Sequence, residues 1–241
     1  LDSSHNQKIK RHYERRCEVI LGDIRNTYLH PDLLDGIDVV IHNASLLPPL
    51  SEIQAALAEE VNVGATHALI RSMEACKRSP RLIFPSSVTV FGKSCLGEGV
   101  KTITDSVSPS DNYTRHKLTI EQILQRSSLQ WVILRVGVSV DSRTLKTDRA
   151  TLRQLLKIHP ESPLEFVHPK DVAVAMCNAV SSKSVNRKIL LIGGGKSCQV
   201  NHYRFLKAAF TALSLRLPYN NTNRESYYTH WMDSAEAQEL L

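Results

Sequence analysis

A tyrosine and a lysine lie four residues apart in the segment "DNYTRHKLTIEQIL", residues 111–124. This spacing places two side chains on one face of a helix, so the Tyr113 phenol and the Lys117 ammonium group are expected to be neighbours. A nearby cation favours the phenolate and lowers the pKa of a tyrosine from its ordinary value of about 10. The pair could therefore exchange a proton with an alcohol or a carbonyl group. On its own the spacing is weak evidence, because a tyrosine and a lysine on a solvated helix face show it too.

A serine upstream strengthens the chemical interpretation. The segment "LIFPSSVTVFG" (82–92) predicts a strand that ends in hydroxyl groups and is followed by a turn at Gly92. A residue at the carboxyl end of a parallel strand faces the crevice where α/β proteins bind ligands. Ser87 could thus hydrogen-bond the substrate oxygen that Tyr113 protonates, and its neighbour Ser86 is the second choice.

The surrounding pattern predicts the elements that would position these residues. Apolar runs predict strands at 17–23, within 36–45, at 81–87 and at 130–136, and helical periodicity covers 51–77. Strands that alternate with helices predict an α/β fold, a Rossmann-like doubly wound parallel sheet. Residues 1–140 are assigned to the domain that contains most of this sheet. Residues 141–241 are assigned mainly to a small α/β substrate lobe, interleaved with the last strands of the sheet.

The second half of the chain carries further local signals. Residues 163–180 predict a strand and then a helix that Pro169 opens, and residues 187–195 predict a strand that ends in glycines. A helix is expected at 201–213. A last helix should begin near residue 233, with Asp233 or Ser234 as its cap.

Seven short motifs resemble those of the extended short-chain dehydrogenase/reductases, also called the NAD-dependent epimerase/dehydratase family. They are "GDI" (22–24), "DVVIHNAS" (38–45), "VNVGAT" (61–66), "FPSSVTVFG" (84–92), Tyr113–Lys117, "VILRVG" (132–137) and "FVHPKDVA" (166–173). Each is weak alone, but their order and spacing also agree. The resemblance covers about residues 1–195 and continues more loosely to the end. It implies that residues 1–140 are an NAD(P)-binding Rossmann domain, which is incomplete.

The resemblance implies roles for four catalytic candidates. Tyr113 looks like the general acid/base, and Lys117 looks like the partner that adjusts its pKa and binds the ribose of the nicotinamide. Ser87 resembles the serine that orients the substrate oxygen. Asn62 matches the asparagine that completes the family's usual set of four.

The resemblance also implies a set of NAD-binding residues. Besides Tyr113 and Lys117, they are Asp2 at the end of a second strand, Asp23 and Ile24 beside the adenine, Asn43, Ala44 and Ser45 in the loop along the cofactor, and Gly137 in the turn past the nicotinamide. The carboxylate of Asp2 would accept from a ribose 2′-hydroxyl and repel a 2′-phosphate, which favours NAD. Because Lys8, Lys10 and Arg11 lie near it, NADP is kept as the second option. No metal ligand is predicted.

The sequence departs from the family pattern at its start. The family opens with a glycine-rich turn, GxxGxxG, that lets the backbone approach the cofactor pyrophosphate, and none of the ten glycines forms it. The simplest expectation is that the first strand, the glycine loop, the first helix and most of the second strand are missing from this sequence. Two lesser departures are Val136 in place of a proline and Phe91 in place of a tyrosine.

Three functions stay open. The first is an NAD(P)-dependent oxidoreductase acting on a secondary alcohol or ketone, with a slight preference for hydroxysteroid-like or other small hydroxy or keto substrates. The second is a nucleotide-sugar epimerase or dehydratase, in which the hydride returns to the substrate. The third is a regulator of the same fold that binds NAD(P) without catalysis.

Composition excludes several other classes. The net charge of +6 is spread out, and the one dense basic run, 8–16, is interrupted by Glu14, so no nucleic-acid partner is expected. No apolar run approaches the roughly 20 residues that span a membrane, and residues 1–21 contain no apolar stretch of the kind found in a signal peptide. Five scattered cysteines without CxxC spacing indicate neither a zinc site nor a disulfide framework and favour a cytoplasmic location. The expected partners are the small substrate and, as an option, a second copy of the chain.

Overall fold

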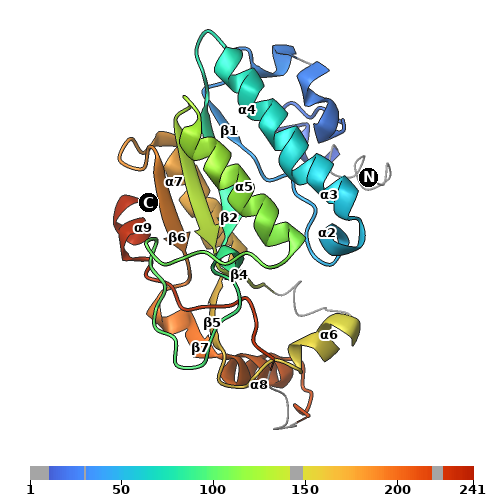
Figure 1. Ribbon diagram of the computed structural model, residues 1–241, viewed down its shortest axis with the longest axis vertical. Helices are drawn as coiled ribbons and strands as arrows, with labels where there is room; N and C mark the ends of the chain where they lie inside the picture. Colours follow the sequence, from blue (N-terminus) through green and yellow to red (C-terminus); the bar gives the residue numbers. More distant parts are fainter. Residues whose placement is uncertain (1–10, 30, 142–148, 219–224) are drawn as a thin grey trace.

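The centre of the computed structural model is a parallel four-stranded sheet with the order β1-β2-β3-β6 (Figure 1). Its strands are β1 (Val39–Ile41), β2 (Arg81–Ser87), β3 (Trp131–Val136) and β6 (Lys188–Ile192). The structure describes residues 11–29, 31–141, 149–218 and 225–241. The predicted parallel α/β sheet is confirmed.

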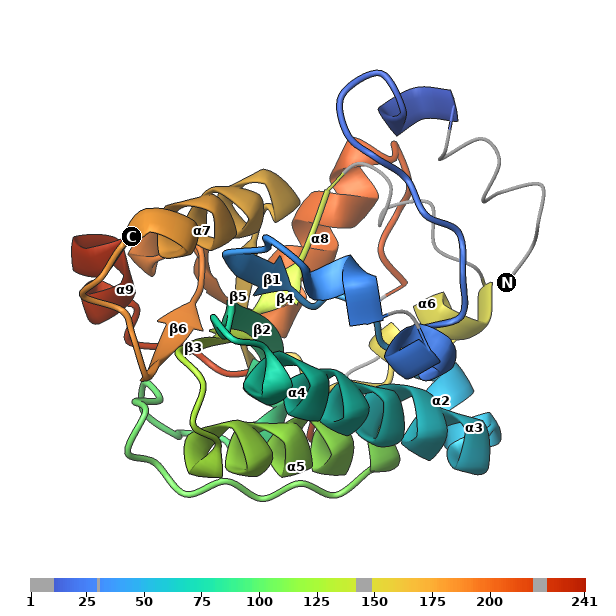
Figure 2. The same ribbon diagram turned by 90° about the horizontal axis from the view of Figure 1, so that it is seen from above.

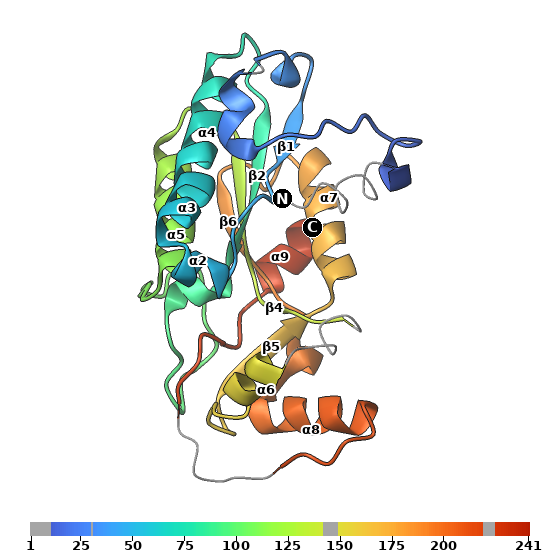
Figure 3. The same cartoon turned by 90° about the vertical axis from the view of Figure 1, so that its right-hand side faces the viewer.

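Helices cover both faces of this sheet (Figures 2 and 3). They are α4 (Ala65–Ala75) and α5 (Asn112–Arg126) on one face, and α7 (Pro169–Ser181) and α9 (Ala235–Leu240) on the other. Because strand side chains alternate in direction, Leu82 and Phe84 of β2 pack with the α4–α5 side, whereas Ile83 packs with the α7 side. Two apolar cores therefore hold β2 from both faces. None of the described helices is long and apolar enough to cross a membrane.

The helical pattern predicted at 51–77 is present but divided. Its pieces are α2 (Leu50–Ile53), α3 (Ala55–Glu59), the π-helical segment η3 (Glu60–Gly64) and α4. A π-helical turn is wider than an α-helical one and is frequent at functional sites. This one contains Asn62.

A second, three-stranded sheet forms a lobe below the first, with the order β4-β5-β7 (Figure 3). Its elements are β4 (Val138–Ser139), α6 (Arg149–Leu155), β5 (Pro163–Val167), η5 (Lys196–Cys198), β7 (Gln199–Asn201) and α8 (His202–Ala212). The chain passes from β3 to β4 through Gly137, whose N–H donates to the Ile192 carbonyl at 2.9 Å. The sequence did not predict β4, β7 or α6.

The glycines after β6 lie where the two sheets meet. The buried carboxylate of Glu165 on β5 accepts hydrogen bonds from Gly195 N (3.1 Å), Gln199 Nε2 (2.9 Å) and Met232 N (2.8 Å). A Cβ atom on Gly193 would overlap with Oε1 of Glu165. The run of glycines therefore makes room for this carboxylate.

The strand predicted at 17–23 is wrong. The described residues 18–23 have no regular structure and lead into the 3₁₀ helices η1 (Ile24–Leu29) and η2 (Pro31–Leu34). A strand needs a hydrogen-bonded neighbour, and within the described ranges β1 pairs only with β2. Ile20 and Leu21 are accordingly 59 % and 49 % exposed.

Candidate active site

Three parallel strands end at one edge of the main sheet, and predicted site residues follow their carboxyl ends. Ser45 lies in the loop after β1, Ser87 is the last residue of β2, and Gly137 follows β3. This edge is where open parallel sheets bind ligands. The structure therefore brings these three residues to the expected place.

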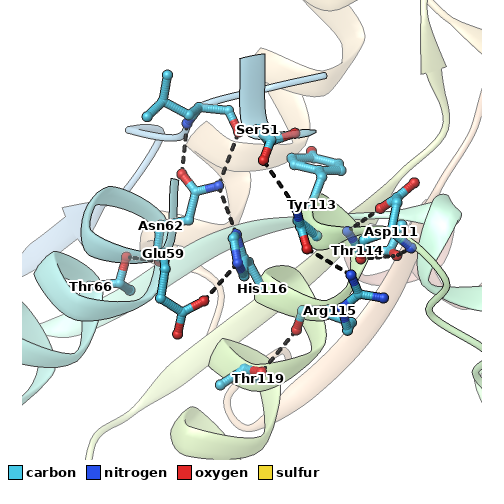
Figure 4. A network of polar contacts seen from close by, with 12 residues as sticks. Ser51, Glu59, Asn62, Thr66, Asp111, Tyr113, Thr114, Arg115, His116 and Thr119 are labelled. Atoms are coloured by element: carbon cyan, nitrogen blue, oxygen red, sulfur yellow. Dashed lines mark hydrogen bonds and ion pairs between the residues drawn. The ribbon is translucent and has the colours of Figure 1, made fainter. Parts of the chain in front are cut away.

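Tyr113 lies in the first turn of α5, and side chains fix the backbone of that turn. The N-cap Asp111 accepts from Thr114 N at 2.7 Å (Figure 4). Glu52 accepts from Asn112 N at 3.1 Å and from Tyr113 N at 3.2 Å. These carboxylates satisfy N–H groups that a helix start leaves without partners. The direction in which the Tyr113 side chain leaves the helix is thereby set.

The hydroxyl of Ser87 faces the phenol of Tyr113 and lowers its pKa by favouring the phenolate. The Oγ atom of Ser87 also accepts from the Thr89 hydroxyl at 2.9 Å and from Thr89 N at 3.3 Å. Because these donors occupy its lone pairs, Ser87 can direct its own proton at the phenol oxygen. The two predicted residues, one at the end of β2 and one in the first turn of α5, thus face each other.

The pKa of Tyr113 moves opposite to the expected direction. Burial raises the pKa of Tyr113 to about 12, and the charge of Asp111 adds to the increase. The Ser87 hydroxyl lowers the pKa of the phenol, but its effect does not outweigh burial. The phenol is therefore protonated at neutral pH.

Lys117 lies on the same helix face as Tyr113, as the spacing predicted. Its Nζ atom is 5.6 Å from the centre of the Tyr113 ring and 4.7 Å from that of Phe84. Nζ donates to the Pro85 carbonyl at 2.8 Å. The side chain is only 7 % exposed, and burial lowers the pKa of Lys117 to about 8.

Ser86, the second choice for the substrate-binding serine, is directed elsewhere. Its hydroxyl donates to the buried Glu121 of α5 at 2.5 Å. Between the two serines, the structure places Ser87 beside Tyr113.

Asn62 connects the loop after β1 to α5 (Figure 4). Its Oδ1 accepts from Leu46 N (2.7 Å) and Ser45 Oγ (3.2 Å), and its Nδ2 donates to Leu46 O (3.0 Å). The Nδ2 atom also lies 3.3 Å from Nδ1 of His116. All the hydrogen-bonding positions of the amide are used, so Asn62 acts here as a brace.

His116 completes this brace. Because Asn62 donates to Nδ1, the ring proton lies on Nε2, where it can donate to Oε2 of Glu59 at 2.7 Å. Figure 4 shows the resulting chain from Asn62 through His116 to Glu59. It ties α3 and η3 to α5 one turn after Tyr113.

The remaining residues predicted to bind the cofactor lie in different surroundings. Asp23 forms an ion pair with Arg25 at 2.6 Å, and hydrogen bonds from Arg25 lower the pKa of Asp23 to about 2. Arg25 also pairs with Glu60 at 2.9 Å, which links the Asp23–Ile24 segment to η3. Asn43 and Ala44 are exposed after β1. Asp2 lies outside the described residues.

Four polar residues around Lys117 and Tyr113 were not selected from the sequence: His42, Glu52, Glu121 and Arg135. His42 and Arg135 lie inside recognised motifs, and Glu121 follows Lys117 at helical spacing, so these positions carried a signal. Glu52 shows its role only through tertiary contact.

A comparison with models of protein families matches residues 1–193 to the NAD dependent epimerase/dehydratase family. The chain belongs to this family. The predicted family is thereby confirmed, and with it NAD as the cofactor on which the family depends.

Two curated proteins are similar to parts of the chain. D-erythronate dehydrogenase of Cupriavidus necator is 23% identical over 205 residues, which are 75% of this chain and 62% of the relative. UDP-glucose 4-epimerase of Yersinia pestis is 36% identical over 120 residues, which are 47% of this chain and 35% of the relative. The chain thus spans less than two thirds of the length of either protein.

A solved structure confirms the fold. The UDP-glucuronic acid 4-epimerase of Bacillus cereus, in complex with UDP-glucuronic acid and NAD, superimposes with a TM-score of 0.78 at 18% identity. The match covers 99% of this chain and 80% of that chain. The parallel main sheet with a small mixed sheet is therefore also the fold of this epimerase.

Proposed function

We propose that the chain carries out NAD-dependent hydride transfer at a secondary alcohol carbon, with Tyr113 as the proton-transferring group. The observation that carries the proposal is that Tyr113 faces the Ser87 hydroxyl, with the Lys117 ammonium group 5.6 Å from the centre of the tyrosine ring. All three lie at the carboxyl edge of the sheet. General acid/base catalysis needs a titratable group within hydrogen-bond reach of the reacting oxygen.

The chemistry follows from these groups. Bound NAD would accept a hydride from the substrate carbon that bears the hydroxyl group. With Tyr113 in its phenolate form, the hydroxyl proton passes to the tyrosine oxygen as the carbon–oxygen bond becomes a double bond. The Ser87 hydroxyl donates a hydrogen bond to the same substrate oxygen and holds it in place. In the reverse direction, the Tyr113 phenol returns the proton to the carbonyl oxygen.

The donors around Lys117 fit a nucleotide ribose. An ammonium group has three N–H donors, and the Pro85 carbonyl uses one of them. The other two can bind ribose hydroxyl groups, as the resemblance to the family implies. The nicotinamide ring of NAD is positively charged, so its binding, together with Lys117, favours the phenolate and opposes the effect of burial on Tyr113.

The relatives support a nucleotide sugar as the substrate better than the hydroxysteroid-like compound that the sequence slightly favoured. The names of the Yersinia pestis and Bacillus cereus proteins are those of UDP-sugar epimerases. In that reaction the hydride returns to the opposite face of the carbon, and the net result is epimerisation. We assign substrate binding to the lobe formed mainly by residues 141–241. A sugar-acid dehydrogenase is the second candidate, because D-erythronate dehydrogenase aligns over the longer stretch.

A substrate comparison tests the proposal. The protein is incubated with NAD and, separately, with UDP-glucose, UDP-glucuronic acid or D-erythronate. The absorbance of reduced nicotinamide and the stereochemistry of the product by NMR are followed. We expect a UDP-sugar to be epimerised without net reduction of NAD. Stoichiometric reduction with D-erythronate would instead establish the dehydrogenase. NAD binding without turnover of any of these compounds or of a wider panel of secondary alcohols would favour the regulator.

A further inference from the structure

The buried carboxylate of Glu121 lies on the inward face of α5, one helical turn after Lys117. Glu121 is 0% exposed. Its Oε1 atom accepts hydrogen bonds from Ser86 Oγ at 2.5 Å and from Arg135 Nε at 3.1 Å. Its Oε2 atom accepts from Arg135 Nη2 at 2.7 Å. The carboxylate therefore joins α5 to β2 and β3 at once.

This ion pair is costly for the fold. Two charges lose their hydration, and apolar replacements of such pairs are often neutral or stabilising. Arg135 is 4% exposed, and one of its terminal nitrogens is buried with no hydrogen-bond partner among the described residues. Stability alone therefore gives a poor reason for placing these charges here.

The position of Glu121 beside Lys117 gives a better reason. Residues four apart on a helix lie on one face, and the charge of Glu121 raises the pKa of Lys117 against the stronger lowering effect of burial. Ser86, which Glu121 binds, directly precedes Ser87. One carboxylate thus acts on the cation of the site and on the strand end that carries its serine.

We propose that Glu121 is a positioning residue, which keeps the ammonium group of Lys117 charged beside Tyr113 and holds the end of β2 against α5. Its effect on Lys117 is a property of the folded chain alone. Its effect on turnover rests on the proposed function.

Other groups also face Lys117. Tyr113 lies on the same helix, and Phe84 and the Pro85 carbonyl come from β2. His42 follows β1, and burial together with the charge of Lys117 lowers its pKa to about 4, so this imidazole is neutral near pH 7. Among these described neighbours, Glu121 supplies the negative charge that favours the ammonium form.

Two variants break the same ion pair but should affect the pKa of Lys117 differently. Glu121→Gln removes the negative charge and leaves Arg135 charged, whereas Arg135→Met keeps the Glu121 carboxyl group. The ionisation of Glu121 in Arg135→Met is followed by ¹³C NMR of the glutamate δ carbon, and the Lys117 pKa values are compared at pH values at which Glu121 is ionised. The pKa of Lys117 is measured in the cofactor-free protein by ¹³C NMR of the lysine ε carbons, with its signal assigned by its loss in Lys117→Arg. We expect Glu121→Gln to lower the pKa of Lys117 by about one unit or more, and Arg135→Met to leave it unchanged or higher.

An ion pair that only stabilises the fold predicts no such difference in sign. An unchanged pKa in Glu121→Gln, or the same downward shift in both variants, would overturn the proposal. If a single variant does not fold, the apolar double variant E121M/R135M replaces it. Lys117 in that protein should still titrate at lower pH than in the parent, and an equal pKa would count against Glu121.

The same proteins link the charge to turnover. In Glu121→Gln the alkaline limb of kcat/KM should move to lower pH together with the Lys117 titration, whereas in Arg135→Met it should not move down. A Lys117 shift in an inactive parent protein would leave the electrostatic inference intact and would refute only the proposed function.

Discussion

The Nζ atom of Lys117 donates a hydrogen bond of 2.8 Å to the backbone carbonyl of Pro85. This contact joins α5, which carries Tyr113, to β2, which ends two residues later at Ser87. The three candidate groups are therefore held in register by tertiary structure. A buried ammonium group that lost this acceptor would carry an unpaired donor, so the contact also constrains where Lys117 can lie.

The two adjacent serines should differ in their effect on turnover. Ser87→Ala removes the hydroxyl that meets Tyr113, and turnover should fall by a factor of roughly 10–10², in line with the loss of about 1.5–3 kcal/mol for a hydrogen bond to a group that develops charge. Ser86→Ala removes a bond to Glu121 and should cost clearly less. Steady-state kinetics of both variants provides the measurement, and a larger loss in Ser86→Ala would reverse the assignment.

Because of Lys117, the free energy of unfolding should change with pH in the alkaline range. The pKa of Lys117 is about 8 in the folded chain, compared with the ordinary lysine value of 10.5, which applies to the unfolded chain. Between pH 8 and 10.5 the unfolded chain therefore binds more protons than the folded chain. Stability should therefore rise as the pH increases from 8 towards 10, by at most about 3 kcal/mol. The raised pKa of Tyr113 acts in the opposite direction, but only above pH 10.

Urea unfolding at several pH values measures this effect. Lys117→Met should lack the rise between pH 8 and 10. The exposed Lys183 provides the control, and Lys183→Met should keep it. Equal pH dependence in the parent and Lys117→Met would mean that the lysine is not destabilised as an ammonium group.

The glycines after β6 should be unequal in their tolerance of a methyl group. Gly193→Ala places a Cβ against the carboxylate of Glu165, and overpacking of this kind typically costs about 1–3 kcal/mol. Gly99→Ala is the matched control, because nothing lies within 4 Å of the position of its Cβ. Thermal unfolding of the two variants compares them. A Gly193→Ala protein as stable as Gly99→Ala would show that the Glu165 junction is not tightly packed.

Local signals account for the parts of the fold that were predicted correctly. β2 and β3 are short apolar runs with buried side chains on both faces, and α5 begins at a capping Asp111. The strand predicted at 17–23 failed because strand formation depends on a neighbour, which no local pattern supplies. The π-helical turn at Asn62 also lacks a local signature, since its register depends on the contacts of Asn62 with Ser45, Leu46 and His116.

The candidate site shows the same division. Helical spacing was sufficient to place Tyr113 beside Lys117, and the end of a strand was sufficient to place Ser87. The pKa of Tyr113 was expected to fall, because the spacing reveals the cation but not the burial that removes water from the phenol. The contact between Glu121 and Arg135 required the packing of α5 on β3.

The most direct test of the central claim removes one oxygen atom, in Tyr113→Phe. Turnover should fall by about 10²–10⁴-fold, as expected for loss of a general acid/base. It is measured with the substrate identified in the test of UDP-sugars and D-erythronate. NAD affinity and the free energy of unfolding should stay close to those of the parent, and Tyr13→Phe, which changes an exposed tyrosine, should keep full activity. A folded Tyr113→Phe protein that binds NAD and retains turnover within threefold of the parent would contradict the assignment of Tyr113 as the proton-transferring group.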